Sequence, residues 1–130
     1  MDKFRTSFSN VENFSPEDIG IFNKKEVEKF IMEELGVTPI WDKHHFIIGY
    51  NENYNVNVNK MLRVTLKDLF GKEEQLKKMQ EMFSIQIYLE IVPYISSESS
   101  EPSQILSIEK DIIAFLYKSN IEMDLDYYLI

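Results

Sequence analysis

The sequence predicts an α+β fold in which helices cover one face of a sheet and leave the other face polar. Segments whose apolar residues alternate are separated by segments with helical periodicity, so strands and helices follow one another along the chain. At least three of the alternating segments are apolar on one side only, whereas buried parallel strands are apolar on both. We therefore expect a two-layer sandwich of about four to five strands with three helices packed on one face.

The composition predicts one folded domain over residues 1–130. Of these residues 44% are hydrophobic and 13% aromatic, which is enough for a packed core. The absence of cysteine excludes disulfides and thiolate metal sites. The net charge of −8 disfavours nucleic acid as a partner and favours basic proteins. Residues 1–10 do not form a signal peptide and no apolar run is long enough to span a membrane, so we expect a cytoplasmic protein.

The first half is predicted to contain a strand, a helix and a hairpin. Residues 3–10 alternate as a strand. A helix opens at Asn23, a capping residue with Glu26 three positions later, and ends at Gly36. Residues 45–58 are expected to form a hairpin that turns at 51–53, with residues 61–64 extending its second arm.

The second half is predicted to contain two helices and two strands. One helix covers residues 67–82, and a strand covers 84–94, which Pro93 either ends or marks as an edge strand. After a polar loop over 96–103, Ser107 caps a helix that Asn120 terminates in the left-handed conformation. The last strand covers residues 121–130.

The candidate site lies on the polar face of the last strand. Glu122, Asp124 and Asp126 alternate with apolar residues and should project from one face together with Tyr128. If the strand over 84–94 is its neighbour, that strand adds Tyr88 and Glu90 to the same face. Tyrosines among carboxylates are suited to a basic protein partner. The predicted partner-binding residues are Tyr88, Glu90, Glu122, Asp124, Asp126 and Tyr128.

No other pattern predicts catalysis, a metal or a cofactor. His44 and His45 are adjacent in a predicted strand and point to opposite faces, so they are poorly placed to share a metal. The four glycines are widely spaced and form no phosphate-binding loop. Trp41 is expected at the edge of the core. The lysines at 72, 77 and 78 are interleaved with acids and are typical of a solvated helix face.

The second half also resembles a known family. A Lys/Glu-rich helix leads into SIQIYLEIVPY, and ILSIEKDIIAFLYKSNIEMDLDYYLI follows a polar loop. With GVTP after the first helix, this pattern resembles the uncharacterised bacterial domain of unknown function family four-two-seven-nine, over residues 23–127. The resemblance implies a small bacterial protein and no catalytic residues. Small acidic proteins of this kind are similar to immunity proteins, which neutralise the toxins of neighbouring bacteria.

The leading hypothesis is therefore a non-enzymatic immunity or inhibitor protein that binds a basic, nuclease-like toxin. One alternative is a metal-dependent hydrolase that uses the row Glu122, Asp124 and Asp126. A second is a structural or homo-oligomeric protein that pairs through an exposed sheet edge. An acidic mimic of nucleic acid ranks last, because 14 Lys and Arg residues balance much of the charge. The sequence leaves the oligomeric state open.

Overall fold

The computed structural model describes residues 4–13, 21–42, 45–54, 57–95, 107–125 and 128–129. The strands in these residues are β1 (Phe4–Asn13), β2 (Ile40–Asp42), β3 (His45–Tyr54), β4 (Gln86–Ile95), β5 (Glu122–Leu125) and β6 (Tyr128–Leu129). The helices are α1 (Ile21–Phe30), which continues as a π-helical turn, η1 (Ile31–Leu35), then α2 (Val58–Leu66), α3 (Glu73–Phe83) and α4 (Lys110–Lys118). The mixed helix and strand class is confirmed.

The strands form one mixed sheet in the order β2-β3-β1-β4-β5, and β6 also pairs with β4. β1 lies at the centre and is antiparallel to both β3 and β4, whereas β5 and β6 run parallel to β4. β5 pairs with β4 up to Ile91, and β6 pairs from Tyr94 onward. Pro93, which has no N–H to donate, therefore lies inside β4 between the two pairings.

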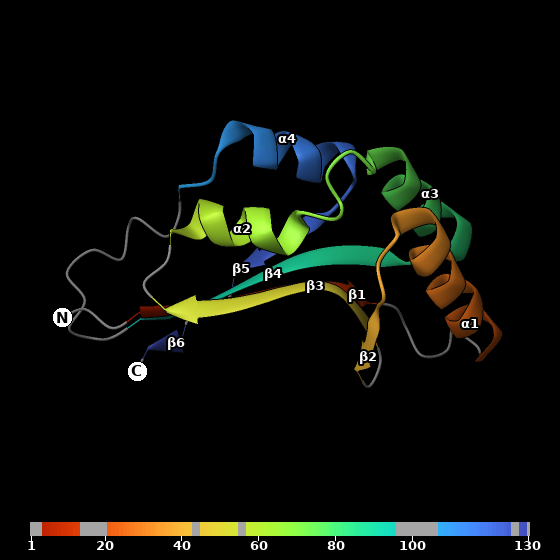
Figure 1. Cartoon of the computed structure of the whole chain (residues 1–130), viewed down its shortest axis with the longest axis horizontal. Helices are drawn as coiled ribbons and strands as arrows, with labels where there is room; N and C mark the ends of the chain where they lie inside the picture. The colour runs from red at the N-terminus through yellow and green to blue at the C-terminus, as the bar shows by residue number, and fades with distance from the viewer. Residues whose placement is uncertain are drawn as a thin grey trace.

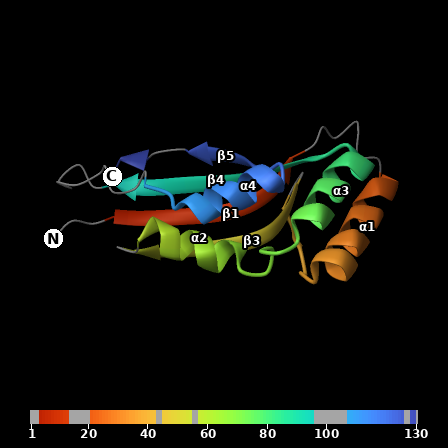
Figure 2. The ribbon, with the colours of Figure 1, turned by 90° about the horizontal axis from the view of Figure 1, so that it is seen from above.

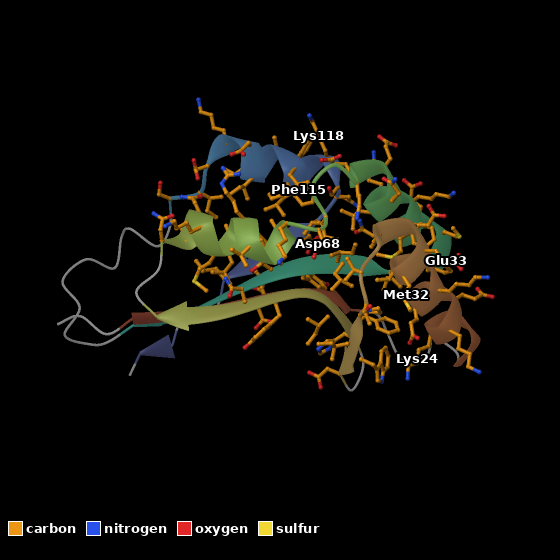
Figure 3. The ribbon with its side chains drawn as sticks, viewed as in Figure 1. Lys24, Met32, Glu33, Asp68, Phe115 and Lys118 are labelled. Carbon is orange, nitrogen blue, oxygen red and sulfur yellow. The ribbon has the colours of Figure 1, made fainter. Side chains whose placement is uncertain are left out.

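α2 and α4 lie over one side of this sheet, and α1 and α3 lie side by side at its end near β2 (Figures 1 and 2). Figure 3 shows Phe115 on the side of α4 that faces the sheet and Lys118 pointing away. The largest fully buried side chains are Phe46, Ile31, Leu35, Met61, Leu62, Leu66, Leu69, Leu76, Met79, Ile87 and Leu89.

The helix predicted to open at Asn23 begins two residues earlier, at Ile21. Asn23 therefore lies inside the first turn, and its predicted role as the N-cap is wrong. The predicted end is confirmed, because Gly36 takes a left-handed φ of 68° that suits a residue without a β-carbon. Lys72 donates a hydrogen bond from Nζ to the Leu35 carbonyl oxygen, where a cation complements the negative end of the helix. The prediction that Lys72 lies on a solvated helix face is therefore wrong.

The predicted hairpin is a single strand followed by a helix. Residues 51–53 continue β3 and pair with β1, Asn51 opposite Phe8 and Asn53 opposite Thr6. The long β1 pairs with β3 from Ile47 to Tyr54, through the residues predicted to turn, so no turn forms there. Residues 61–64 lie in α2 because the side chain of Asn57 caps that helix, accepting from the N–H groups of residues 59 and 60 at 2.9 and 3.3 Å.

The helix predicted over residues 67–82 is interrupted before α3. Gly71 adopts a φ of +86°, which lies outside the right-handed helical region. The chain therefore turns between Leu66 and Glu73. The number of elements therefore differs from the prediction: the described residues contain six strands and four α-helices. The segment after β3 became a helix, the terminal strand is divided into β5 and β6, and β2 was not predicted.

α4 begins later than predicted, with Glu109 in the N-cap position. Ser107 is not the cap; its carbonyl oxygen accepts a hydrogen bond from Asn59 Nδ2 at 3.0 Å. Asn59 Oδ1 in turn accepts a hydrogen bond from the Glu109 N–H at 2.9 Å. Asn59 of α2 therefore provides hydrogen-bond partners for the backbone just before α4. Asn120 ends the segment at a left-handed φ of 58°, as predicted. No helix in the described ranges is long and apolar enough to span a membrane.

Candidate functional site

The strand pairing places four predicted site residues beside one another. β4 and β5 are neighbours, with Tyr88 opposite Glu122 and Glu90 opposite Asp124. Residues that pair directly across neighbouring strands project from the same face of a sheet. Ile87, Leu89 and Ile91 are buried beneath the helices, so the alternate residues of β4 belong to the other face. We call this other side of the sheet the open face.

Glu122 and Asp124 are exposed, and Tyr88 and Glu90 are half-buried. Tyr88 donates a hydrogen bond from its hydroxyl to Gln86 Oε1 at 2.6 Å, two residues away on the same face. This bond holds the phenol along β4. Asp126 lies outside the described residues. Tyr128 is described by its backbone alone, opposite Tyr94.

Glu90 and Asp124 form a pair of carboxylates on adjacent strands, whose backbones lie about 4.8 Å apart. Like charges directly opposite one another in a sheet are destabilising by a few tenths of a kcal/mol up to about 1 kcal/mol. In the described part of the chain, the ion pairs involve other residues, namely His45 with Asp42 and Arg63 with Glu109 and Asp111. Glu90 and Asp124 therefore lie opposite one another without a salt bridge among the described residues.

Tyr50 of β3 is a residue that the sequence prediction missed. It pairs with Ser9, and Ser9 pairs on its other side with Glu90, so Tyr50, Ser9, Glu90 and Asp124 form one row across four strands. The Tyr50 side chain is 54% exposed. The register of β3 shifts between Asn10 and Val11, which leaves Ile48 without an opposite residue. This bulge reverses the alternation within β3 and hides Tyr50 from a simple period-two pattern.

The outer strand β5 also exposes its apolar residues. Met123 and Leu125 alternate with the two acids and are 48% and 37% exposed. Ile121, which precedes β5, is buried, so only the start of this alternating segment reaches the core. α4 contacts β5 without covering these side chains, because its buried residues Phe115 and Leu116 are directed at the interior.

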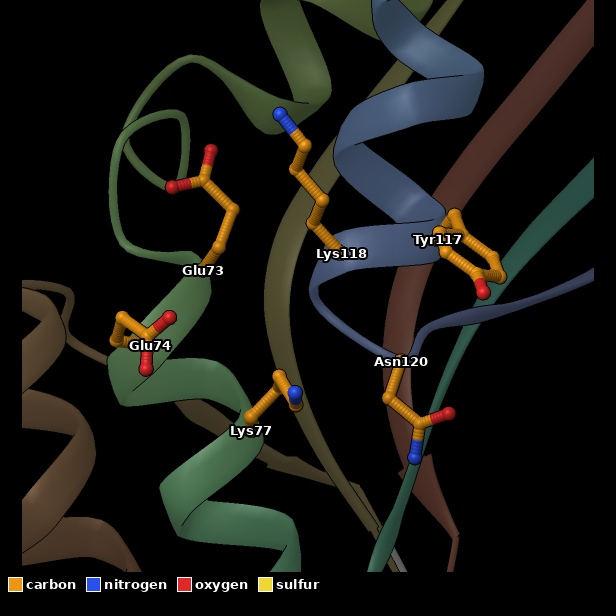
Figure 4. Close-up of a pocket in the computed structure, with 6 residues that line it drawn as sticks. All are labelled: Glu73, Glu74, Lys77, Tyr117, Lys118 and Asn120. Carbon is orange, nitrogen blue, oxygen red and sulfur yellow. The ribbon is translucent and has the colours of Figure 1, made fainter.

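Among the described residues, open depressions of mixed charge lie between the helices. One has a volume of about 500 Å³ and lies between α3 and α4 (Figure 4). Its lining residues are Glu73, Glu74, Lys77, Tyr117, Lys118 and Asn120. In Figure 4 Lys118 extends from α4 toward Glu73 at the start of α3. Acids and lysines are thus interleaved around the opening, and no single charge dominates it.

The second depression, of about 330 Å³, adjoins an ion pair between α2 and α4. The two terminal guanidinium nitrogens of Arg63, Nη1 and Nη2, donate to the Asp111 carboxylate at 2.8 and 2.9 Å. These hydrogen bonds lower the pKa of Asp111 below its ordinary range and, in the same pair, raise the pKa of Arg63. Glu109 also pairs with Arg63 at 3.3 Å. The Arg63 cluster joins α2 to α4, and its single guanidinium is already paired with two carboxylates.

His45 and Trp41 occupy separate positions at the β2 end of the sheet. His45 is half-buried with Nε2 3.5 Å from Asp42 Oδ2, and His44 lies outside the described residues. Trp41 packs at the edge of the core, as predicted, with its ring 4.8 Å from Phe46 and with Lys24 4.3 Å from its centroid. Within the described ranges, no three His, Asp or Glu side chains gather as metal ligands would. The metal-dependent alternative, which includes Asp126, stays a prediction.

No curated protein and no solved structure matches this chain. A family match covers residues 26–130, which include the second half of α1 and all later helices and strands among the described residues. The central strand β1 precedes the matched region. The match confirms the resemblance identified from the sequence: the chain belongs to the family described as Domain of unknown function (DUF4279).

Proposed function

We propose that this chain is a non-enzymatic protein-binding module of the immunity or inhibitor type. It docks the open face of its sheet against a basic protein, most concretely a nuclease-like bacterial toxin, in the cytoplasm. The layout we infer is a two-layer sandwich in which the helices occupy one face and the partner occupies the other. The family match names no activity, so the proposal depends on the surface itself.

The carboxylate pair Glu90 and Asp124 is the observation that carries this proposal. The sheet keeps two like charges adjacent although they repel each other. A lysine or arginine of a partner placed over the pair would interact with both carboxylates and remove that repulsion. Charge complementarity of this kind mainly accelerates association and excludes wrong partners. The net charge of −8 acts in the same direction at longer range.

Tyrosines on both sides of the pair provide the contact area that charges alone lack. Tyr50 lies in the same row as Glu90, and Tyr88 precedes Glu90 by two residues on β4. Tyrosine buries a large rigid surface at low entropic cost and is enriched among residues that dominate binding energy. A complex on this surface would therefore associate through the acids and be retained through the phenols.

The test is binding of the purified chain to the product of the reading frame adjacent to its own gene. Binding is measured by stopped flow at low and physiological salt, and inhibition of any toxic activity is measured in parallel. Replacing the pair by lysines (Glu90→Lys with Asp124→Lys) should lower the association rate at least tenfold at low salt. The matched control is Glu33→Lys with Glu34→Lys, which makes the same charge change on exposed residues of η1.

The association rate of the control should fall by much less, because Glu33 lies beside α1 at one end of the molecule, whereas Asp124 lies on β5 (Figures 1 and 3). Equal association rates for the two charge-reversed variants would show that only net charge matters and would remove the open face as the docking site. A neighbouring product that does not bind at all, or that binds without loss of its activity, would overturn the immunity assignment.

A further inference from the structure

The free edge of the sheet at β5 adds a second element to this surface. Among the strands described, β5 is last in the order and pairs with β4 alone. The outer side of such a strand presents backbone N–H and C=O groups that another extended segment can pair with. The opposite edge differs, because Trp41 in β2 packs on the core and is not free to line a pairing edge. β5 is therefore the edge better suited to pairing.

Two kinds of side chain alternate along β5. Glu122 and Asp124 belong to the open face, and Met123 and Leu125 project toward the helices yet remain substantially exposed. α4 extends the exposed apolar strip that Met123 and Leu125 form. Ile113 and Tyr117 lie one helical turn apart on the flank of α4 away from Asp111, and Asp111 is the residue that faces α2. Figure 2 shows α2 on one side of α4 and β5 on the other.

We propose that β5 adds a strand contributed by the partner, and that this strand alternates basic and apolar residues. Its basic side chains would lie beside Glu122 and Asp124, and its apolar side chains beside Met123 and Leu125. The backbone hydrogen bonds would supply affinity and the alternation would supply specificity, as in other cases of strand addition. This inference rests on the proposed function, because it takes the partner to be a basic protein and specifies the segment that is bound.

A second copy of this chain is a poor occupant of the same edge. Symmetric pairing of β5 with itself would place the open faces of the two sheets side by side. Glu122 and Asp124 would then lie beside the same acids of the other copy, where like charges are destabilising. The acids thus discourage self-association while they attract a basic strand.

The probe is a blocked synthetic peptide in which lysine and valine alternate, labelled for fluorescence anisotropy. One control peptide has the same composition with the lysines and valines in separate blocks. A second has the alternating sequence with every backbone nitrogen methylated, so that it keeps its side chains and charge but cannot donate to a strand. Amide hydrogen exchange of Glu122–Leu125 is followed by NMR with and without each peptide.

The alternating peptide should bind roughly tenfold more tightly than either control peptide and should slow amide exchange in β5. Replacing both exposed apolar residues (Met123→Ser with Leu125→Ser) should weaken its binding by a similar factor. Met32→Ser, at an exposed methionine of η1, is the matched control and should leave binding unchanged.

Equal binding of all three peptides, without protection of β5, would overturn strand addition but keep charge-driven docking on the open face. Failure of the alternating peptide to bind would also overturn strand addition; the acids of β5 would then serve to prevent self-pairing alone. The proposed function is decided separately, by the binding and inhibition of the neighbouring gene product, so either proposal can fail without the other.

Discussion

Gly49 on β3 lies directly against the backbone of Thr65 on α2. A β-carbon at Gly49 would be 2.4 Å from the Thr65 carbonyl oxygen, well inside contact distance. The residue before it, Ile48, is the unpaired residue of the bulge, so this point of β3 combines a register shift with a close helix contact. Glycine is what allows α2 to approach the sheet this closely.

Gly49→Ala should therefore reduce the free energy of unfolding by about 2 kcal/mol or more, as overpacking against backbone atoms does. Gly71→Ala is the matched control, because a β-carbon there meets nothing within 4 Å and only the left-handed φ of +86° opposes it. We expect the control to cost about 1 kcal/mol. Urea unfolding of both variants checks this order, and equal costs would show that α2 moves away easily.

Gln80 is a buried polar residue that joins three elements. Its Nε2 donates to the carbonyl oxygens of Leu76, at 3.1 Å, and Ser119, at 2.8 Å, and its Oε1 accepts from the Ile87 N–H at 3.4 Å. Gln80→Leu keeps a similar volume but leaves buried backbone groups without this partner, so it should cost about 1–3 kcal/mol. Gln75→Leu, on the same helix and half-buried, should change stability by less than about 0.5 kcal/mol.

The alternation of residues along β4 and β5 made the open face predictable from the sequence. Tyr88, Glu90, Glu122 and Asp124 each follow the period of two in a single strand, so each could be assigned to a face locally. The pairing of the two strands was a conditional prediction that the register confirms. Local patterning therefore identified most of the candidate surface.

The rest depended on contacts between distant residues. The central position of β1 and its pairing with residues 51–53 join segments more than 40 positions apart, and no local pattern encodes such pairing. The same pairing explains why the asparagine-rich residues 51–53 continue the strand and do not turn. The bulge at Ile48 explains why the alternation did not assign Tyr50 to the open face. Gly71 was the local sign that α2 and α3 are separate helices. A glycine alone only weakens a helix, however, and the break became certain only from the left-handed φ of Gly71 in the structure.

The ion pair between Arg63 and Asp111 should make stability depend on acid pH. Asp111 has a pKa below its ordinary value because Arg63 hydrogen-bonds to the ionised form, so the pair stabilises the fold above the unfolded pKa of about 3.9. This contribution is lost as the pH falls through the lower, folded pKa. The difference in unfolding free energy between the native chain and Asp111→Asn should be constant near neutral pH and shrink in that acid range.

Asp124→Asn is the matched control for this pH series, because Asp124 is an exposed acid opposite another carboxylate rather than an arginine. It should show no loss of stability relative to the native chain at neutral pH. Urea unfolding at a series of pH values measures both differences. A native-minus-variant difference for Asp111→Asn that does not change with pH would contradict the role of the Arg63 hydrogen bonds.

Asn57 should account for a measurable part of the stability of α2. Its side chain accepts from two N–H groups that have no partner within the helix. Asn57→Ala should cost about 1 kcal/mol, and Asn57→Asp, which keeps the accepting oxygen, should cost little. Thermal or urea unfolding checks both. Similar losses in the two variants would mean that the amide group of Asn57 contributes beyond capping.

Glu90→Gln should stabilise the fold by a few tenths of a kcal/mol up to about 1 kcal/mol, because it removes the like-charge repulsion with Asp124. The gain should be largest at low salt and should decline as salt screens the two carboxylates. Glu74→Gln on α3 removes the same charge from an exposed helix position and serves as the control. A functional surface is often kept at some cost in stability. The same variant should therefore bind a basic partner more slowly, and a variant that became more stable with no loss of association would indicate that the pair is only a solvated feature of the sheet.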